Sequence, residues 1–176
     1  MTSQILFTVL IGAVALERLA ELVVATRNAR WAFDRGGREY GFGHYPVMVI
    51  LHTGLLAGCL AEVWLTDRPF LPLLGVVMLV LALGSQGLRW WCIAVLGRQW
   101  NTRVIVVPEL PLVTTGPYRW LRHPNYVAVV VEGFALPLVH SAWLTALVFT
   151  VCNAALLTVR IRTEDRALTG AAPRGG

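Results

Sequence analysis

The chain has 176 residues, of which 56% are hydrophobic and only 14% are charged, and its mean hydropathy is +0.63. Soluble domains carry roughly 25% charged residues, so this composition excludes an ordinary soluble domain and indicates an integral membrane protein. The net charge of +5 comes from arginine, since the sequence contains no lysine. The arginines cluster between apolar runs, which is typical of cytoplasmic loops beside anionic lipids rather than of a nucleic-acid-binding surface.

Five apolar stretches predict membrane-spanning helices, each of which needs ~20 mostly apolar residues. The first is expected to be retained, because it has no basic leading region and carries Glu17, Arg18 and Glu21 where a signal peptide stays apolar. The sequence therefore predicts an all-α membrane protein with one domain: three spans in residues 1–96, a motif region at 97–168 and a disordered tail at 169–176. The five expected spans are residues 5–24, 46–65, 70–96, 126–139 and 142–159.

The topology follows from the loops between these stretches. Only His140 and Ser141 separate the last two, and so short a turn predicts an antiparallel helical hairpin. The loops after the first and third stretches and the segment after the last are rich in arginine, whereas the two remaining loops contain Arg68 alone. The positive-inside rule then predicts an outside N-terminus and a cytoplasmic C-terminus. We expect a multi-pass protein of the inner cell membrane whose site faces the cytoplasm.

Charged side chains inside apolar stretches are costly in lipid and must face protein or water. Arg18 and Glu21 are three residues apart and are expected to pair on one helix. A structural role is expected for Glu62, which stands alone in the second stretch. Glu132 follows His123 by nine residues, in a short apolar helix rich in valine, and is a candidate for a functional role.

Two prolines organise the polar segment GPYRWLRHPNY. Pro117 is expected in the first turn of a short helix and Pro124 in the first turn of the next one. The free backbone N–H groups at that second helix start, together with Arg122 and His123, would suit a carboxylate or a phosphate.

The C-terminal segment RIRTEDRAL supplies the opposite charge. The hairpin is expected to return Glu164 and Asp165 to the membrane level of His123, just beyond the last span. One recess would then offer donors for a carboxylate and acceptors for an ammonium or ribose hydroxyls, as a cofactor bearing an amino acid requires. A solvated charge cluster at the membrane surface is the alternative.

These residues resemble a known family. The pattern G-x-Y-x-x-x-R-H-P-x-Y, preceded by GRQWNTRV and followed after the hairpin by RIRTEDRAL, is similar to the isoprenylcysteine carboxyl methyltransferases and, more widely, to phospholipid methyltransferases. The resemblance implies S-adenosylmethionine in a cytoplasm-facing pocket that opens laterally to the bilayer for a lipid acceptor. It assigns the cofactor to Tyr118, Arg122, His123, Pro124, Tyr126, Glu164 and Asp165, and the segment leading into the site to Trp100, Asn101 and Arg103.

This sequence departs from the eukaryotic members in one respect. Their acidic run is longer than the Glu164–Asp165 pair found here, so which acid would bind the cofactor amine is left open.

The acceptor decides which further residues would act. Methyl transfer needs proximity, alignment and exclusion of water, and no metal is expected. A carboxylate acceptor would need only a cation such as Arg162, whereas a hydroxyl would benefit from a base, for which Glu132 is the best candidate. Small bacterial proteins that resemble this chain include enzymes that O-methylate alkylpyrones or alkylresorcinols. Glu132 in the fourth helix favours such a lipophilic hydroxyl over a phospholipid amine or the carboxyl of a prenylated acceptor, as in isoprenylcysteine.

Two other classes of function remain open at the level of sequence. Membrane sterol-type reductases share a similar R-H-P-x-Y signature but bind NADPH. A non-enzymatic small membrane protein would also explain the spans and the arginines. The three cysteines, which lie within or beside apolar stretches without metal-ligand or C-x-x-C spacing, are expected to be structural thiols.

Overall fold

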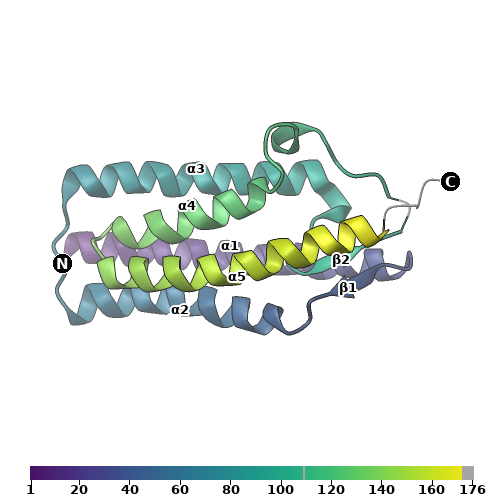
Figure 1. The fold of residues 1–176 in the computed structure, drawn as a ribbon. Coiled ribbons are helices and arrows are strands. Elements are labelled where there is room, and N and C mark those ends of the chain that lie inside the picture. The colour runs from purple at the N-terminus through teal and green to yellow at the C-terminus, as the bar shows by residue number, and fades with distance from the viewer. Residues whose placement is uncertain (109, 172–176) are drawn as a thin grey trace.

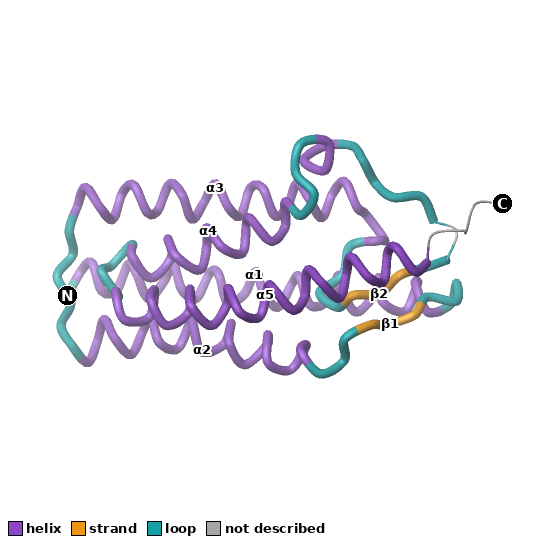
Figure 2. Tube along the Cα trace, in the orientation of Figure 1, coloured by secondary structure: helices purple, strands orange, loops and turns teal. Residues whose placement is uncertain are grey.

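The computed structural model describes residues 1–108 and 110–171, in which five α-helices run side by side with a two-stranded ribbon at one end of the bundle (Figure 1). Two short 3-10 helices and the connecting loops complete this part of the chain (Figure 2). The helices are α1 (Thr2–Phe33), α2 (His44–Leu65), α3 (Pro72–Leu96), α4 (Pro124–Leu138) and α5 (Trp143–Ala171). The other elements are β1 (Arg38–Tyr40), β2 (Val104–Val106), η1 (Gly97–Gln99) and η2 (Gly116–Arg119).

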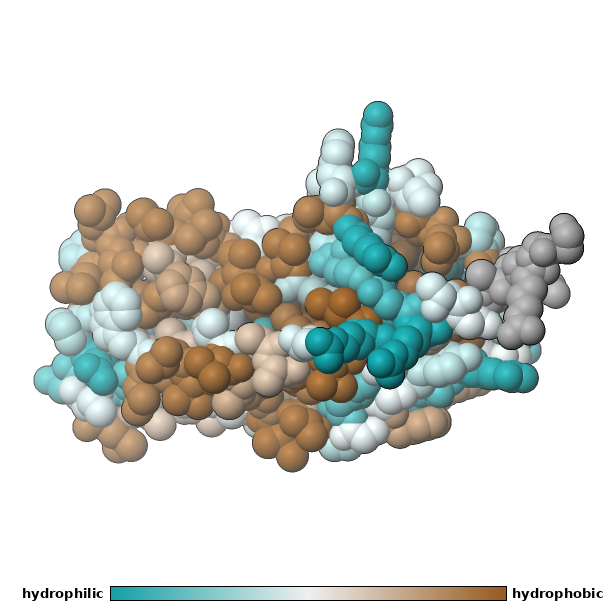
Figure 3. Space-filling view, in the orientation of Figure 1, coloured by the Kyte–Doolittle hydropathy of each residue, from teal (hydrophilic) through white to brown (hydrophobic). Residues whose placement is uncertain are grey.

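Three of these helices, α2, α3 and α5, are long and apolar enough to cross a membrane, while α4 is a shorter apolar helix. Their outer faces expose large hydrophobic side chains such as Leu73, Val80 and Leu147. Soluble monomers rarely expose apolar patches of this extent, and Figure 3 shows them over the half of the bundle that lies away from the C-terminus. The chain is therefore a multi-pass membrane protein, whereas the five predicted spans stay a prediction for α1 and α4.

The structure corrects three expectations. The ribbon, which pairs Arg38 with Val106 and Tyr40 with Val104 in antiparallel register, was absent from the all-α prediction. Helix α5 continues to Ala171, so Glu164 and Asp165 lie within a helix and not beyond it. The predicted tail also begins too early, because residues 169–171 are helical, while residues 172–176 lie outside the described part of the chain.

The arginine-rich segments gather at one end of the bundle, which we call the basic end. The ribbon brings the loop after α1 to the loop after α3, and the C-terminal half of α5 packs against both strands (Figure 1). The loop with Arg68 and the turn between α4 and α5 lie at the opposite end. Such an arrangement agrees with the alternation of basic and non-basic loops along the sequence.

The predicted helical hairpin of α4 and α5 is confirmed, and two features fix it. Gly133 allows the helices to meet closely, because a Cβ atom there would lie 2.0 Å from Cε1 of the buried Phe149. In the turn, Ser141 adopts a positive φ of 57° and His140 is buried, with its ring against those of Phe7 and Phe70.

Glu62 joins α2 to the start of α5, in agreement with its expected structural role. The backbone N–H groups of Leu144 and Thr145 donate to its two carboxylate oxygens at 3.1 and 2.8 Å. An Arg68 guanidinium nitrogen lies 2.9 Å from the same carboxylate. Since the first N–H groups of a helix lack intrahelical partners, Glu62 caps α5 from a neighbouring helix.

Candidate functional site

A cavity of about 510 Å³ opens at the basic end, between the end of α1, β2, η2, the start of α4 and the C-terminal half of α5. This volume lies in the ~300–1,000 Å³ range of small-molecule sites. One part of its wall is polar, whereas residues 104–107, Leu110, Leu112 and Val113 make another part apolar. The predicted site residues that line it are Trp100, Asn101, Arg103, Tyr118, Arg122, His123, Tyr126 and Glu164.

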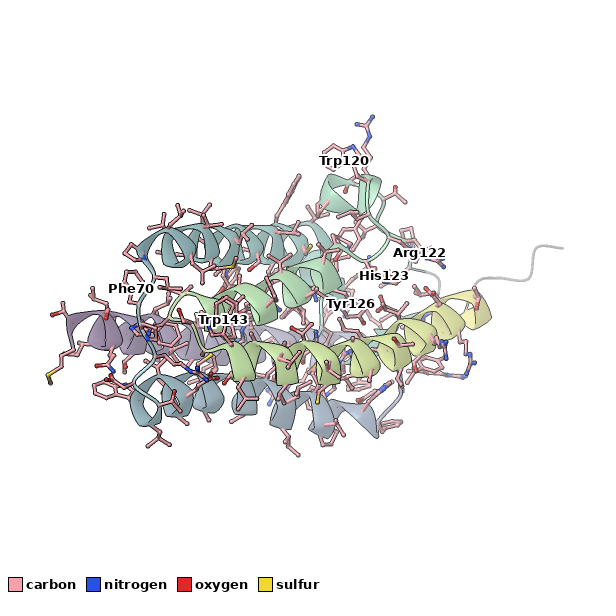
Figure 4. The ribbon with its side chains drawn as sticks, turned by 60° about the vertical axis from the view of Figure 1, so that its left-hand side comes forward. Phe70, Trp120, Arg122, His123, Tyr126 and Trp143 are labelled. Carbon is pink, nitrogen blue, oxygen red and sulfur yellow. The ribbon has the colours of Figure 1, made fainter. Side chains whose placement is uncertain are left out.

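Four side chains of the polar wall and one beside it form what we call the mouth cluster: Arg122, His123, Tyr126 and Glu164 on the wall, and Asp165 next to them. Figure 4 shows Arg122, His123 and Tyr126 together at this end of the bundle. The Tyr126 hydroxyl donates to Glu164 Oε2 at 2.6 Å, and its ring stacks on that of His123 with centroids 5.5 Å apart. His123 Nε2 lies 3.3 Å from Asp165 Oδ1 and Nδ1 lies 3.9 Å from Glu164 Oε1. Arg122 extends an Nη atom to 3.2 Å from Asp165 Oδ1. The start of α4 and the distal half of α5 thus bring both charges to one place.

Helix α4 owes its start to the two residues ahead of Asn125. His123 is the N-cap residue and Pro124, whose missing N–H costs nothing in a first turn, begins the helix as predicted. Pro124 is buried and is absent from the cavity wall, as is Asp165, whose carboxylate lies 3.2 Å from Arg122 and 3.3 Å from His123. The sequence-based set therefore divides into wall residues and supporting residues.

Four wall residues present a buried polar atom that has no hydrogen-bond partner within the described residues: Trp100 Nε1, His123 Nε2, Asn125 Oδ1 and Arg160 Nε. Two of these groups are neutral, the Nε1 donor of Trp100 and the Oδ1 acceptor of Asn125. Trp100 is 2% exposed and its carbonyl oxygen accepts a hydrogen bond of 2.7 Å from Asn28 of α1. A buried unsatisfied polar group costs about 1–3 kcal/mol, so both atoms are suited to a ligand that completes their bonding.

Tyr118 closes the cavity on the α3 side. Burial raises the pKa of its phenol well above the usual range, and the neighbouring Cys92 thiol adds to the shift. The hydroxyl therefore stays protonated at neutral pH and serves as a hydrogen-bond donor.

The sequence analysis missed Arg160 and selected Arg162. Arg160 is 6% exposed and lines the cavity, with one guanidinium nitrogen donating to the Thr102 carbonyl at 2.8 Å. Arg162 is exposed and outside the cavity wall. Because α5 continues through this segment, Arg160 and Glu164 are four residues apart on one face. That spacing was the available signal, but it required the helix to extend beyond residue 159.

Glu132 lies deeper than the cavity, six residues beyond Tyr126 and so ~9 Å further along the helix axis. One Arg18 guanidinium nitrogen lies 2.6 and 2.7 Å from its two oxygens, and an Arg89 guanidinium nitrogen lies 2.5 Å from one of them. The structure does not bring Glu132 to the cavity wall. We define the bundle ion cluster by the residues that join α1, α3 and α4 here: Glu17, Arg18, Glu21, Gln86, Arg89 and Glu132.

The expected local pair of Arg18 and Glu21 is present within the bundle ion cluster, at 2.5 Å. Arg89 near the end of α3 also points into the bundle and is 5% exposed. In residues 1–108 and 110–171, no group of three or more His, Cys, Asp or Glu side chains is arranged to hold a metal ion.

Comparison with known proteins gives two relatives of similar length and a match to part of a longer one. The chain is 39% identical over 164 residues to the uncharacterised protein YpbQ of Bacillus subtilis, covering 93% of this chain and 96% of the relative. An uncharacterised protein of Haemophilus influenzae is 24% identical over 160 residues, covering 89% and 91%. The cobalt-zinc-cadmium resistance protein CzcN of Cupriavidus metallidurans is 34% identical over 101 residues, covering 57% and 43%.

Residues 76–170 match the isoprenylcysteine carboxyl methyltransferase family, and this region contains η2, the helical hairpin and every residue of the mouth cluster. Membership implies a membrane methyltransferase. The chain belongs to the isoprenylcysteine carboxyl methyltransferase family.

Proposed function

We propose that the protein is an S-adenosylmethionine-dependent methyltransferase that methylates an oxygen of a lipophilic acceptor. The observation that carries the proposal is the mouth cluster, which places cations and the Glu164 carboxylate on the wall of a cavity that is otherwise largely apolar, with Asp165 beside them. A zwitterionic cofactor and an apolar acceptor would each find matching surface there.

The residues fit the cofactor on two grounds. Arg122, His123 and the start of α4 would hold its carboxylate, since a helix N-terminus and cationic side chains favour an anion. Glu164 and Asp165 would accept from its ammonium, with Tyr126 fixing the Glu164 carboxylate through their hydrogen bond. The buried, unpartnered Oδ1 of Asn125 is a further acceptor in the same wall. When bound, S-adenosylmethionine supplies an electrophilic methyl group on a sulfonium.

The contacts of Glu132 narrow the acceptor class. With its carboxylate engaged by two arginines and outside the cavity, Glu132 is unsuited to remove a proton from a bound hydroxyl. Arg160 in the cavity wall would instead hold an oxygen that is already anionic. We therefore favour a carboxylate or an acidic enol or phenol, such as that of an alkylpyrone or alkylresorcinol, aligned by Arg160 and shielded from water by the apolar wall.

We further propose that the protein crosses the inner cell membrane five times and that its basic end faces the cytoplasm. The arginine-rich segments at the basic end support this orientation. The 15 residues of α4 extend only ~22 Å, against a hydrocarbon core of ~30 Å. Its start would therefore lie below the headgroup level, which provides a recess open to water.

The test is binding of S-adenosylhomocysteine, with NADPH as the competing ligand, to the full chain in lipid nanodiscs. We expect calorimetric binding of S-adenosylhomocysteine alone, and at least a tenfold loss of affinity in Glu164→Gln, because a charged hydrogen-bond partner is worth about 1.5–3 kcal/mol. Arg162→Gln is the matched control on the exposed face of α5 and should bind normally. Binding of NADPH alone would make the protein a reductase, and unchanged affinity in Glu164→Gln would remove the mouth cluster from the site.

A further inference from the structure

The segment Leu110–Leu121, which contains η2, projects sideways from the bundle beside the end of α3 (Figures 1 and 4). Its contacts with α3 fix its position along the bundle. Gly116, with φ 58°, lies so close to α3 that a Cβ atom would be 2.6 Å from Val95 Cγ2. The Trp120 ring meets that of Trp91 edge-on, with centroids 6.0 Å apart. The segment is thus attached to α3, a membrane-crossing helix, at the level of Trp91 and Val95.

The length of α3 sets the depth of that level. At 1.5 Å per residue, a hydrocarbon core of ~30 Å takes about 20 residues, which from Pro72 extends to about Trp91. Trp90 and Trp91 are 41% and 45% exposed, as in the aromatic belts at membrane interfaces. Because Trp120 packs on Trp91, the segment projects at the boundary between the acyl chains and the headgroups.

The side chains of the segment suit this boundary. Trp120 and Leu112 are 69% and 68% exposed, and Leu121 is 42% exposed. The sequence of residues 110–122 contains Arg119 and Arg122 and no acidic residue. Exposed aromatic and aliphatic side chains beside arginines are what an anionic lipid surface binds.

The same segment is also a wall of the cavity. Leu110, Leu112, Val113, Thr114 and Tyr118 line the cavity, whereas the exposed Trp120 and Leu121 of the same segment are absent from its wall. The segment therefore presents some of its side chains to the cavity and others away from it.

We propose that residues Leu110–Leu121 are an interfacial membrane segment, inserted among anionic lipid headgroups, that forms the wall between the bilayer and the cavity. If the proposed function holds, the position of this segment also defines how the acceptor enters. The acceptor would approach along the headgroup boundary on the α3 side of the bundle, past Leu112. The polar end of an amphipathic acceptor would then already lie at the depth of the cavity.

The depth of Trp120 is measurable without any methyl transfer. A Trp120→Cys chain in a Cys152→Ser background, labelled with bimane in nanodiscs, is exposed in turn to iodide, to lipid with a shallow nitroxide and to lipid with a deep nitroxide. The labelled wild-type Cys152, which is exposed on α5, provides the embedded reference, and Asp34→Cys in the same background provides the aqueous one. We expect the label at position 120 to be quenched most by the shallow nitroxide. Iodide should quench the label at position 34 and should not quench the label at position 120.

A label at position 120 that behaves like the one at position 34 would overturn the proposal. Leu112→Cys repeats the measurement if the Trp120 variant fails to fold. Nitroxide attached to phosphatidylglycerol should quench more than the same group on phosphatidylcholine, and Arg119→Gln should reduce that preference by up to about fivefold. Equal quenching by the two lipids would remove the anionic headgroups from the proposal. Binding of S-adenosylhomocysteine in the same discs reports separately on the proposed function.

Discussion

The bundle ion cluster and the mouth cluster contain the same kinds of side chain and differ in how completely these are paired. In the bundle ion cluster, Glu132 receives bonds of 2.5 to 2.7 Å from two arginines and is 5% exposed. In the mouth cluster, the ion-pair distances are 3.2 to 3.9 Å and the two acidic side chains are each 31% exposed beside a cavity. Close, complete pairing uses up the capacity of a charge to bind anything else, so the looser cluster is the better candidate for a ligand.

The largest effect is expected for Glu132→Gln. Removing one partner of a buried ion pair costs about 3–5 kcal/mol, because the remaining charge is left uncompensated, and here both Arg18 and Arg89 lose their carboxylate. Thermal unfolding in detergent should show the loss. Glu17→Gln is the matched control: Glu17 is bonded by Gln86 and Trp90 at the edge of the same cluster, and its loss should matter far less.

A Glu132→Gln chain with unchanged stability and greatly reduced methyl transfer would reverse this interpretation. Glu132 would then act in the reaction, as the sequence analysis expected.

Arg160→Gln tests whether the cavity wall binds an anionic oxygen of the acceptor, for which an alkylthioacetate, a carboxylate with an apolar chain, is a suitable probe. Charge-assisted hydrogen bonds contribute about 1.5–3 kcal/mol, so the variant should bind a water-soluble alkylthioacetate at least tenfold more weakly, as measured by calorimetry. Affinity for S-adenosylhomocysteine should change little. Arg162→Gln provides the comparison two residues away, and an equal loss in both variants would mean that the ligand responds only to the net charge of the basic end.

Gly133→Ala tests the hairpin that joins the two clusters through α4. The added methyl group would meet the buried Phe149 ring, and overpacking of this kind costs typically 1–3 kcal/mol. The unfolding temperature should fall, whereas Gly84→Ala should change it little, since no heavy atom beyond its own helix turn lies within 4 Å of that site in the described structure. Recovery in Gly133→Ala combined with Phe149→Leu would identify the ring as the cause.

What the sequence predicted well depends on local patterns. The hairpin follows from two apolar stretches with almost nothing between them, and the start of α4 follows from Pro124. Of the twelve residues assigned to the site, eight line the cavity, and their roles there stay predictions.

What the sequence could not predict depends on distant partners. Glu132 follows three valines in the sequence, while its partners Arg18 and Arg89 are 114 and 43 residues away. The ribbon pairs β1 with the distant β2, and although Val104–Val106 is a β-branched run typical of a strand, nothing local in the sequence indicates its partner. Arg160 was missed because the polarity after residue 159 indicated the end of a span, although the helix continues through it.

The smallest effect is expected within the mouth cluster itself, for Arg122→Gln. The Arg122 side chain is 74% exposed, and exposed ion pairs contribute about 0.2–1 kcal/mol and weaken with added salt. Its loss should lower the affinity for S-adenosylhomocysteine less than fivefold, and the difference from wild type should disappear in high salt. His123→Ala, whose side chain is 16% exposed and lies between two carboxylates, should lose more affinity at every salt concentration. If Arg122→Gln lost more affinity than His123→Ala, binding of S-adenosylhomocysteine would depend on the long-range electrostatic field of the basic end. The geometry of the cavity wall would then matter less than its charge.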